Sequence, residues 1–143
     1  MRFFHISDLH IGKRVNGFSM LEDQKLILQQ ILDLAEKYCP DGVLIAGDLY
    51  DKSMPSGEAV ETADEFLFQL SRQGIPVWAV SGNHDSPERI AYGARMMDQA
   101  GIHMSRVFDG KLQRHTFTDK KGGTVDLYLL PFIKPGTVRK FFP

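Results

Sequence analysis

The stretch GVLIAGDLYD, residues 42 to 51, changes abruptly from apolar to polar side chains. Its apolar half, residues 42–46, is short and bounded by glycine, which is typical of a strand buried on both faces of a sheet. Gly47 and Asp48 then begin a polar turn that we expect to extend to Ser56. The stretch therefore predicts a buried strand whose carboxyl end carries acidic side chains.

Strands and helices alternate on both sides of this stretch. Two further apolar runs predict strands over residues 2–6 and 75–80. Apolar residues at helical spacing predict helices over residues 20–38, 57–73 and 87 to about 100. A regular alternation of strand and helix favours a parallel sheet with right-handed crossovers.

A different pattern follows the third predicted helix. Residues 111–118 and 124–130 are separated by DKKGG and predict an antiparallel hairpin. The predicted fold class is therefore α/β, with a parallel βαβαβα core followed by a β-hairpin.

Composition limits the kind of protein. The chain has 143 residues, of which 43% are hydrophobic and 24% charged, as expected for one globular domain with a core. Its net charge of −1 neither indicates nor excludes a polyanionic partner.

The single cysteine, Cys39, is expected to pack rather than to act as a nucleophile. Because the sequence shows neither a signal peptide nor a run of about 18 apolar residues, we expect a cytoplasmic protein with no membrane contact.

Side chains that bind metals or transfer protons follow each of the three predicted strands. They are Asp8 and His10 after the first, Asp48 and Asp51 after the second, and Asn83, His84 and Asp85 after the third. The carboxyl ends of parallel strands meet at one edge of a sheet. We therefore expect these side chains to share one crevice.

The residue types favour a centre with two metal ions. Asp8 and His10 are separated by one residue, so both can chelate one ion, and this pair suits Mn, Fe or Zn better than Ca. Asp48 has two carboxylate oxygens, which can bridge two cations about 3.5 to 4 Å apart. Asn83 offers a neutral amide oxygen to a second ion.

Two of the remaining residues are candidates for catalysis. His84, beside such a centre, can donate a proton to a leaving alkoxide or stabilise charge on a phosphate. Asp51 is expected to hold the ring of His84, whereas Asp85 is expected only to fix the turn before Ser86. Each motif taken alone is more typical of a turn or a helix cap. Their occurrence after three separate strands favours a shared site.

The chain resembles the calcineurin-like metallophosphoesterase superfamily, whose signature begins D-x-H, G-D and G-N-H-D/E. The matching residues are Asp8-Leu9-His10, Gly47-Asp48 and Gly82-Asn83-His84-Asp85. The resemblance implies a β-sandwich flanked by helices in an αββα order. It assigns Asp8, His10 and Asp48 to one metal ion, Asp48 and Asn83 to a second, and His84 with Asp51 to catalysis.

Longer stretches, SDLHIG, GDLYDKSMPS and GIPVWAVSGNHDSPER, are similar to DNA nucleases of this superfamily. That similarity implies two divalent ions, most often Mn²⁺, and DNA as the substrate of exonuclease and hairpin or single-strand endonuclease activity. It also implies an SbcC-type ATPase as partner in DNA repair and recombination, and a homodimer within a heterotetrameric complex. The alternatives are a phosphoesterase on a small or protein substrate, and a non-catalytic scaffold of the same fold.

The later part of the family's signature is missing from these residues. The family completes its site with a lone histidine and a G-H-x-H type motif, and His5, His103 and His115 lack that spacing, so we interpret them as structural or surface residues. Residues 1–143 are therefore expected to be the N-terminal part of a longer domain. Its second metal position would be incomplete, with weak metal occupancy and little activity.

Overall fold

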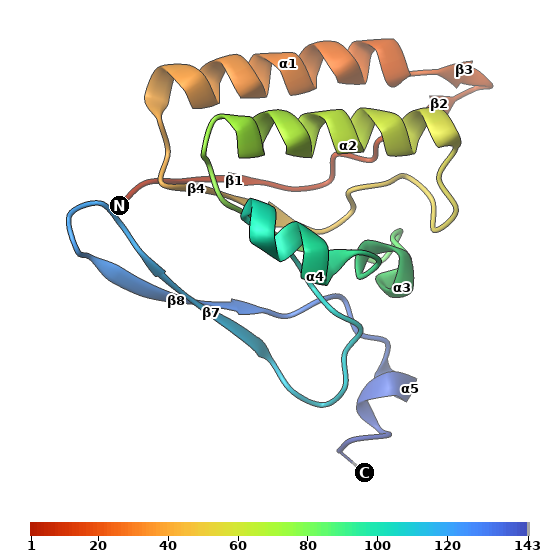
Figure 1. Ribbon diagram of the computed structural model, residues 1–143. Helices are drawn as coiled ribbons and strands as arrows, with labels where there is room; N and C mark the ends of the chain where they lie inside the picture. The colour runs from red at the N-terminus through yellow and green to blue at the C-terminus, as the bar shows by residue number, and fades with distance from the viewer. Residues whose placement is uncertain (143) are drawn as a thin grey trace.

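The computed structural model describes residues 1–142 as three layers (Figure 1). The middle layer is a parallel sheet of four strands in the order β1-β4-β5-β6. Two long helices, α1 and α2, cover one face, and the hairpin of β7 and β8 lies on the opposite face. The strands are β1 (Phe3–Ile6), β4 (Gly42–Ala46), β5 (Val77–Val80), β6 (Ile102–Met104), β7 (Gln113–Thr118) and β8 (Thr124–Leu129).

The two long helices begin and end close to the predicted residues. Helix α1 spans Leu21–Tyr38, and its chain turns away at Cys39, which has a left-handed backbone. Helix α2 spans Gly57–Arg72 and is capped by Ser56, whose hydroxyl accepts a hydrogen bond from the backbone of Ala59. The predicted α/β class with a following hairpin is therefore confirmed for this N-terminal portion of the fold.

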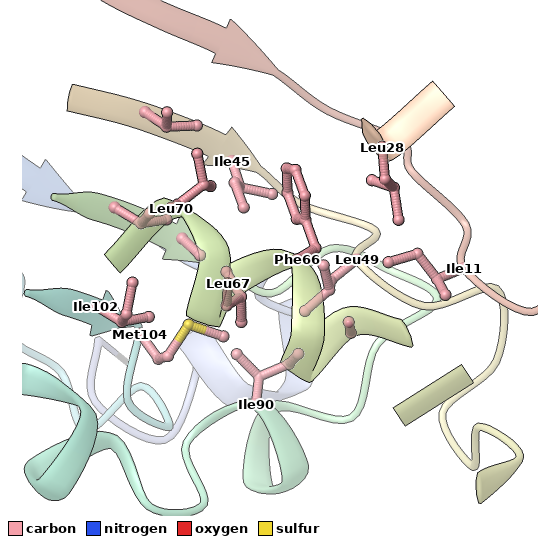
Figure 2. Packing of buried hydrophobic residues seen from close by; sticks show 14 of the residues in the cluster. Ile11, Leu28, Ile45, Leu49, Phe66, Leu67, Leu70, Ile90, Ile102 and Met104 are labelled. Atoms are coloured by element: carbon pink, nitrogen blue, oxygen red, sulfur yellow. The ribbon is translucent and has the colours of Figure 1, made fainter. Parts of the chain in front are cut away.

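The core lies between the sheet and the helices α1 and α2, and α2 supplies its large side chains next to β4 (Figure 2). Alternate residues of β4 and β5 point to this face because successive side chains of a strand point to opposite sides. Ile45 of β4 meets Phe66 and Leu70 of α2, and all three side chains are almost fully buried. Burying side chains of this size contributes about 1.5–3 kcal/mol each, so the helical layer holds the sheet in place.

Aromatic rings fill the space between the sheet and the hairpin. Trp78 of β5 stacks on His103 of β6 with ring centroids 5.3 Å apart. Phe117 of the hairpin packs edge-on against Trp78 at 5.3 Å and against Phe3 of β1 at 5.9 Å. His115, also on the hairpin, lies 4.6 Å from His103. Two of the histidines interpreted as structural, His103 and His115, thus belong to this packing.

Strand pairing brings three strand ends to one edge. Ile6 at the end of β1 pairs with Ile45, and Val80 at the end of β5 pairs with Ala46 at the end of β4. Because the pairing is parallel, the carboxyl ends of all three strands lie at the same end of the sheet. The loops that follow them are therefore neighbours.

The structure corrects the prediction for residues 87 to about 100, which do not form one helix. They form two short helices, α3 (Pro87–Ile90) and α4 (Ala94–Met97), and a 3-10 turn at Asp98–Ala100. Gly93 has a φ of 72°, which an α-helix does not allow. The adjacent Tyr92 is exposed, so its ring contributes little packing that could hold a continuous helix there.

Several short elements were not predicted. The fourth strand, β6, follows this broken segment and has only three residues. The loop after β1 contains a small antiparallel pair, β2 (Arg14–Val15) and β3 (Phe18–Ser19), and a last turn of helix, α5, spans Pro135–Val138. Elements this short lack a periodic pattern and depend on the surrounding fold.

Two expectations from composition can be compared with the structure. Within residues 1–142, no helix combines the length and the apolar character needed to cross a membrane. Cys39 is exposed, so the expectation that it serves packing is wrong. It lies at the left-handed end of α1, where the chain turns back toward β4.

The position of His115 predicts that acid weakens the fold. Burial lowers the pKa of His115, and the neighbouring His103 adds to that effect. The unfolded chain then binds a proton at a higher pH than the folded chain. The free energy of unfolding should therefore fall as the pH drops below about 6.5 and level off below the folded-state pKa.

The variant His115→Gln, which cannot take up the proton, should lose less stability over that range. Urea unfolding at a series of pH values measures the difference. Equal slopes for the variant and the wild type would show that His115 makes no contribution.

Candidate metal centre

A cavity of about 490 Å³ lies where the three loops meet. Asp8 comes from the loop after β1, Asp48 from the loop after β4, and Asn83 from the loop after β5, and all three line this cavity. Its remaining wall is the segment 130–133 that follows the hairpin. The structure thus brings together these predicted residues, which are 35 or more positions apart in the sequence.

His10 lies between two carboxylates. Its Nε2 is 3.8 Å from Oδ1 of Asp8 and 3.8 Å from Oδ2 of Asp48. Two ligand atoms that each lie about 2.1 Å from one cation are about 3.0 to 3.7 Å apart, depending on the angle between them. These three side chains are therefore close to the spacing that one divalent ion requires.

The other nitrogen of the His10 ring faces Asp51. Nδ1 of His10 is 3.3 Å from Oδ1 of Asp51, although the approach lies outside hydrogen-bond geometry and this buried nitrogen has no other partner within residues 1–142. Histidines that bind a metal usually direct their second ring nitrogen to a carboxylate or carbonyl oxygen, which sets the orientation of the ring. The donor set and its surroundings therefore fit a metal ion.

His84 is oriented by Asp51 in a different way from the one predicted. Its Nδ1 lies 2.9 Å from the main-chain oxygen of Asp51. The carboxylate of Asp51 faces His10 instead. A carbonyl oxygen can only accept, so Nδ1 carries the hydrogen and Nε2 is left free. The two rings meet edge to face, with centroids 4.8 Å apart.

His84 also belongs to a cluster of possible ligands that the sequence did not single out. One ligand atom from each of His10, Asp48 and His84 lies within 4.8 Å of the others. His84 and Asn83 line a second hollow, of about 480 Å³. His84 is thus close to the candidate ligands and also open to a bound substrate.

The backbone of the candidate ligands is held in an unusual conformation. Asp8, His10 and Asp48 have positive φ values of 55°, 45° and 51°, in the left-handed region that side chains other than glycine rarely adopt. Backbone hydrogen bonds support it: Asp8 N–H donates to the oxygen of Gly47, and His10 N–H to that of Asp48. Such strain is concentrated at functional sites, where the surrounding structure maintains it.

Asp85 does more than fix its own turn. Its carboxylate is buried and accepts hydrogen bonds from the backbone N–H groups of Leu49, Tyr50 and Gly82. The first two belong to the loop after β4 and the third to the loop after β5. Asp85 therefore fastens together the loops that carry Asp48 and Asn83.

The nearby Tyr50 phenol has a raised pKa. The main cause is the burial of the phenol, and the negative charge of Asp85 adds to it.

Gly82 allows Asp48 its position. A Cβ atom at residue 82 would overlap Oδ1 and the backbone nitrogen of Asp48, and it would lie 2.6 Å from the carboxylate carbon. The same oxygen accepts a hydrogen bond from the backbone of His84 at 2.9 Å. The first glycine of the GNHD motif is thus needed for close approach of the two loops.

The sequence alone indicated too small a role for Asp85 and no contribution from the segment 130–133. The motif G-N-H-D contained the signal for Asp85, because a carboxylate beside several N–H groups is a common way to close a polar turn. The segment 130–133 has no such signal: the backbone of Phe132 donates to the oxygen of Ser81, which only the folded chain brings near.

Replacing Gly82 should damage the centre. The variant Gly82→Ala would push the Asp48 carboxylate out of place, so we expect at least about a tenfold loss of Mn²⁺ affinity and a cost of about 1–3 kcal/mol in stability. Gly57→Ala is the matched control, because a Cβ there would meet no other part of the described chain within 4 Å and the residue lies at the start of a helix. Isothermal titration with Mn²⁺ would contradict this account if both variants bound like the wild type.

Replacing Asp85 should loosen two loops at once. In Asp85→Ala, three buried or half-buried N–H groups lose a charged acceptor, and we expect a loss of about 3 kcal/mol or more in the free energy of unfolding. Asp64→Ala, an exposed position on α2, serves as the control and should change stability by less than about 0.5 kcal/mol. Equal unfolding midpoints in urea for the two variants would rule out the fastening role of Asp85.

Comparison with known proteins agrees with this geometry. The family model for calcineurin-like phosphoesterases matches residues 1–137. Two SbcD-type subunits of the nuclease SbcCD are similar over 99% of this chain: that of Staphylococcus saprophyticus is 33% identical and that of Staphylococcus epidermidis 37% identical. The chain spans 37% of the length of each of these relatives. The chain belongs to the calcineurin-like phosphoesterase family.

Proposed function

We propose that this chain is the N-terminal part of the nuclease subunit of a DNA-processing complex, a metal-dependent phosphodiesterase that acts as an exonuclease and as a hairpin or single-strand endonuclease. The observation that carries the proposal is the convergence of His10, Asp48 and His84 within 4.8 Å at the edge of a parallel sheet. The similarity to two SbcCD nuclease subunits supports DNA as the substrate. An SbcC-type ATPase would be the partner, in a cytoplasmic heterotetramer that contains a homodimer of this subunit and acts in DNA repair and recombination.

The chain's own residues would hold two divalent ions, most often Mn²⁺. Asp8, His10 and Asp48 would bind one, and Asp48 with Asn83 would contribute to the second. The remaining ligands of the second ion would come from outside residues 1–143, so this stretch alone would hold that ion weakly and cleave little DNA. Ions held by these residues would neutralise the phosphate oxygens and lower the pKa of a water molecule.

His84 would act on the departing sugar oxygen. Its Nδ1 hydrogen is held by the main-chain oxygen of Asp51, so Nε2 is the nitrogen that can face a substrate. In its protonated form Nε2 can give a hydrogen bond or a proton to the leaving oxygen. The His84 ring packs edge to face against the ring of His10. Asp51 would thus serve two rings, through its carbonyl for His84 and its carboxylate for His10.

The proposal is tested in the full-length protein with its ATPase partner. Asp48→Asn should abolish both Mn²⁺ binding and cleavage of linear and hairpin DNA. His84→Gln should keep Mn²⁺ binding but slow cleavage by about a hundredfold or more, the usual loss when a general acid is removed. Asp64→Asn, on the exposed face of α2, should cleave like the wild type.

The outcomes separate the alternatives. Undiminished cleavage by Asp48→Asn and His84→Gln would disprove a catalytic role for these residues. Hydrolysis of a chromogenic phosphodiester without any cleavage of DNA would indicate a phosphoesterase for smaller substrates. Binding of the ATPase without either activity would indicate a scaffold. Loss of Mn²⁺ binding in His84→Gln would show that His84 is a ligand.

A further inference from the structure

Gln24 uses both ends of its side-chain amide on one loop. The residue lies in the first turns of α1, and its Oε1 accepts a hydrogen bond of 2.9 Å from the backbone of Gly12. Its Nε2 donates to the backbone oxygens of Leu9 at 3.0 Å and His10 at 2.7 Å. One half-buried side chain therefore supplies three hydrogen bonds to the loop that carries Asp8 and His10.

The loop after β4 holds the same segment through other groups. The N–H of His10 donates to the oxygen of Asp48, and the N–H of Ile11 donates to the oxygen of Leu49, both at 2.9 Å. The peptide group between Leu9 and His10 is thus bonded through its N–H to the loop after β4 and through its oxygen to Gln24. The next peptide group, between His10 and Ile11, is bonded in the same two ways, and its oxygen also accepts a hydrogen bond from the N–H of Lys13 at 3.0 Å.

Fixing both peptide groups fixes the direction of the His10 side chain. The two peptide planes that flank a residue define its φ and ψ, and these define where its Cα–Cβ bond points. His10 has a φ of 45°, a conformation that a histidine rarely adopts without support from its surroundings. Gln24 supplies part of that support through the backbone oxygens of Leu9 and His10, which the hydrogen bonds to the loop after β4 do not use.

We infer that Gln24 is a positioning residue of the metal centre, which aims the His10 imidazole through its backbone. This inference rests on the proposed function, because it takes His10 as a metal ligand. Gln24 itself is placed against backbone atoms and not against the ion. A role limited to fastening α1 to the sheet would affect stability, but it would not affect metal affinity selectively.

The test compares three variants of the full-length protein. Gln24→Met keeps the length of the side chain and removes all three hydrogen bonds, whereas Gln24→Asn keeps the amide but withdraws it by one methylene. Gln29→Met is the matched control on the same helix, because within residues 1–142 the amide of Gln29 bonds only Asp33, on the surface. The measurements are Mn²⁺ affinity by electron paramagnetic resonance, hydrogen exchange of residues 9–12 without metal, and the urea midpoint.

We expect both Gln24 variants to bind Mn²⁺ at least about tenfold more weakly, as is usual when a residue that orients a ligand is removed. Exchange at Gly12 should be faster in the Gln24 variants and unchanged in Gln29→Met. Saturating Mn²⁺ should restore most of the cleavage rate, because only the affinity has changed. Wild-type Mn²⁺ affinity in either folded Gln24 variant would overturn the inference, and so would failure of both to fold while Gln29→Met folds.

The same measurements separate this inference from the proposed function. Wild-type protein that binds Mn²⁺ but cleaves no DNA would disprove the nuclease, whereas weaker Mn²⁺ binding in the Gln24 variants would still establish the positioning role. A nuclease whose Mn²⁺ affinity does not respond to Gln24 would leave the proposed function intact and overturn the inference.

Discussion

The buried carboxylate of Asp85 accepts N–H groups from two loops that leave neighbouring strands, at Leu49 and Tyr50 on one side and at Gly82 on the other. A buried carboxylate is stable only when several donors surround it, so these hydrogen bonds hold the two loops together. Their closeness then requires a glycine at position 82, because any side chain would displace Asp48. The placement of the candidate ligands depends on this one interaction.

Around it, the centre is built from backbone that is held in place before any ion binds. Three candidate ligands have left-handed backbone, and each lies in a loop whose peptide groups are hydrogen bonded to another loop. Asp51 contacts both histidines: its main-chain carbonyl orients His84, while its carboxylate faces His10. Such preorganisation lets a site bind its ion without first ordering a flexible loop.

Much of the fold followed from pattern alone. Strand 42–46 and helix α2 were predicted within a residue, because long periodic segments bury one face against a core. The predictions were wrong where the pattern was short or interrupted. Residues 87–100 have helical composition, but Gly93 breaks the helix there, and β6 becomes a strand only through its pairing with β5.

By itself the sequence determined the candidate residues of the site, since Asp8, His10, Asp48, Asn83 and His84 follow strands whose parallel order was readable from their alternation with helices. It also indicated the family, through the spacing of its motifs. Only the tertiary structure decided how these residues are held: which atom of Asp51 meets His84, and that Asp85 joins two loops. Those contacts join atoms far apart in the chain, and their direction depends on backbone angles that local patterns of polarity do not encode.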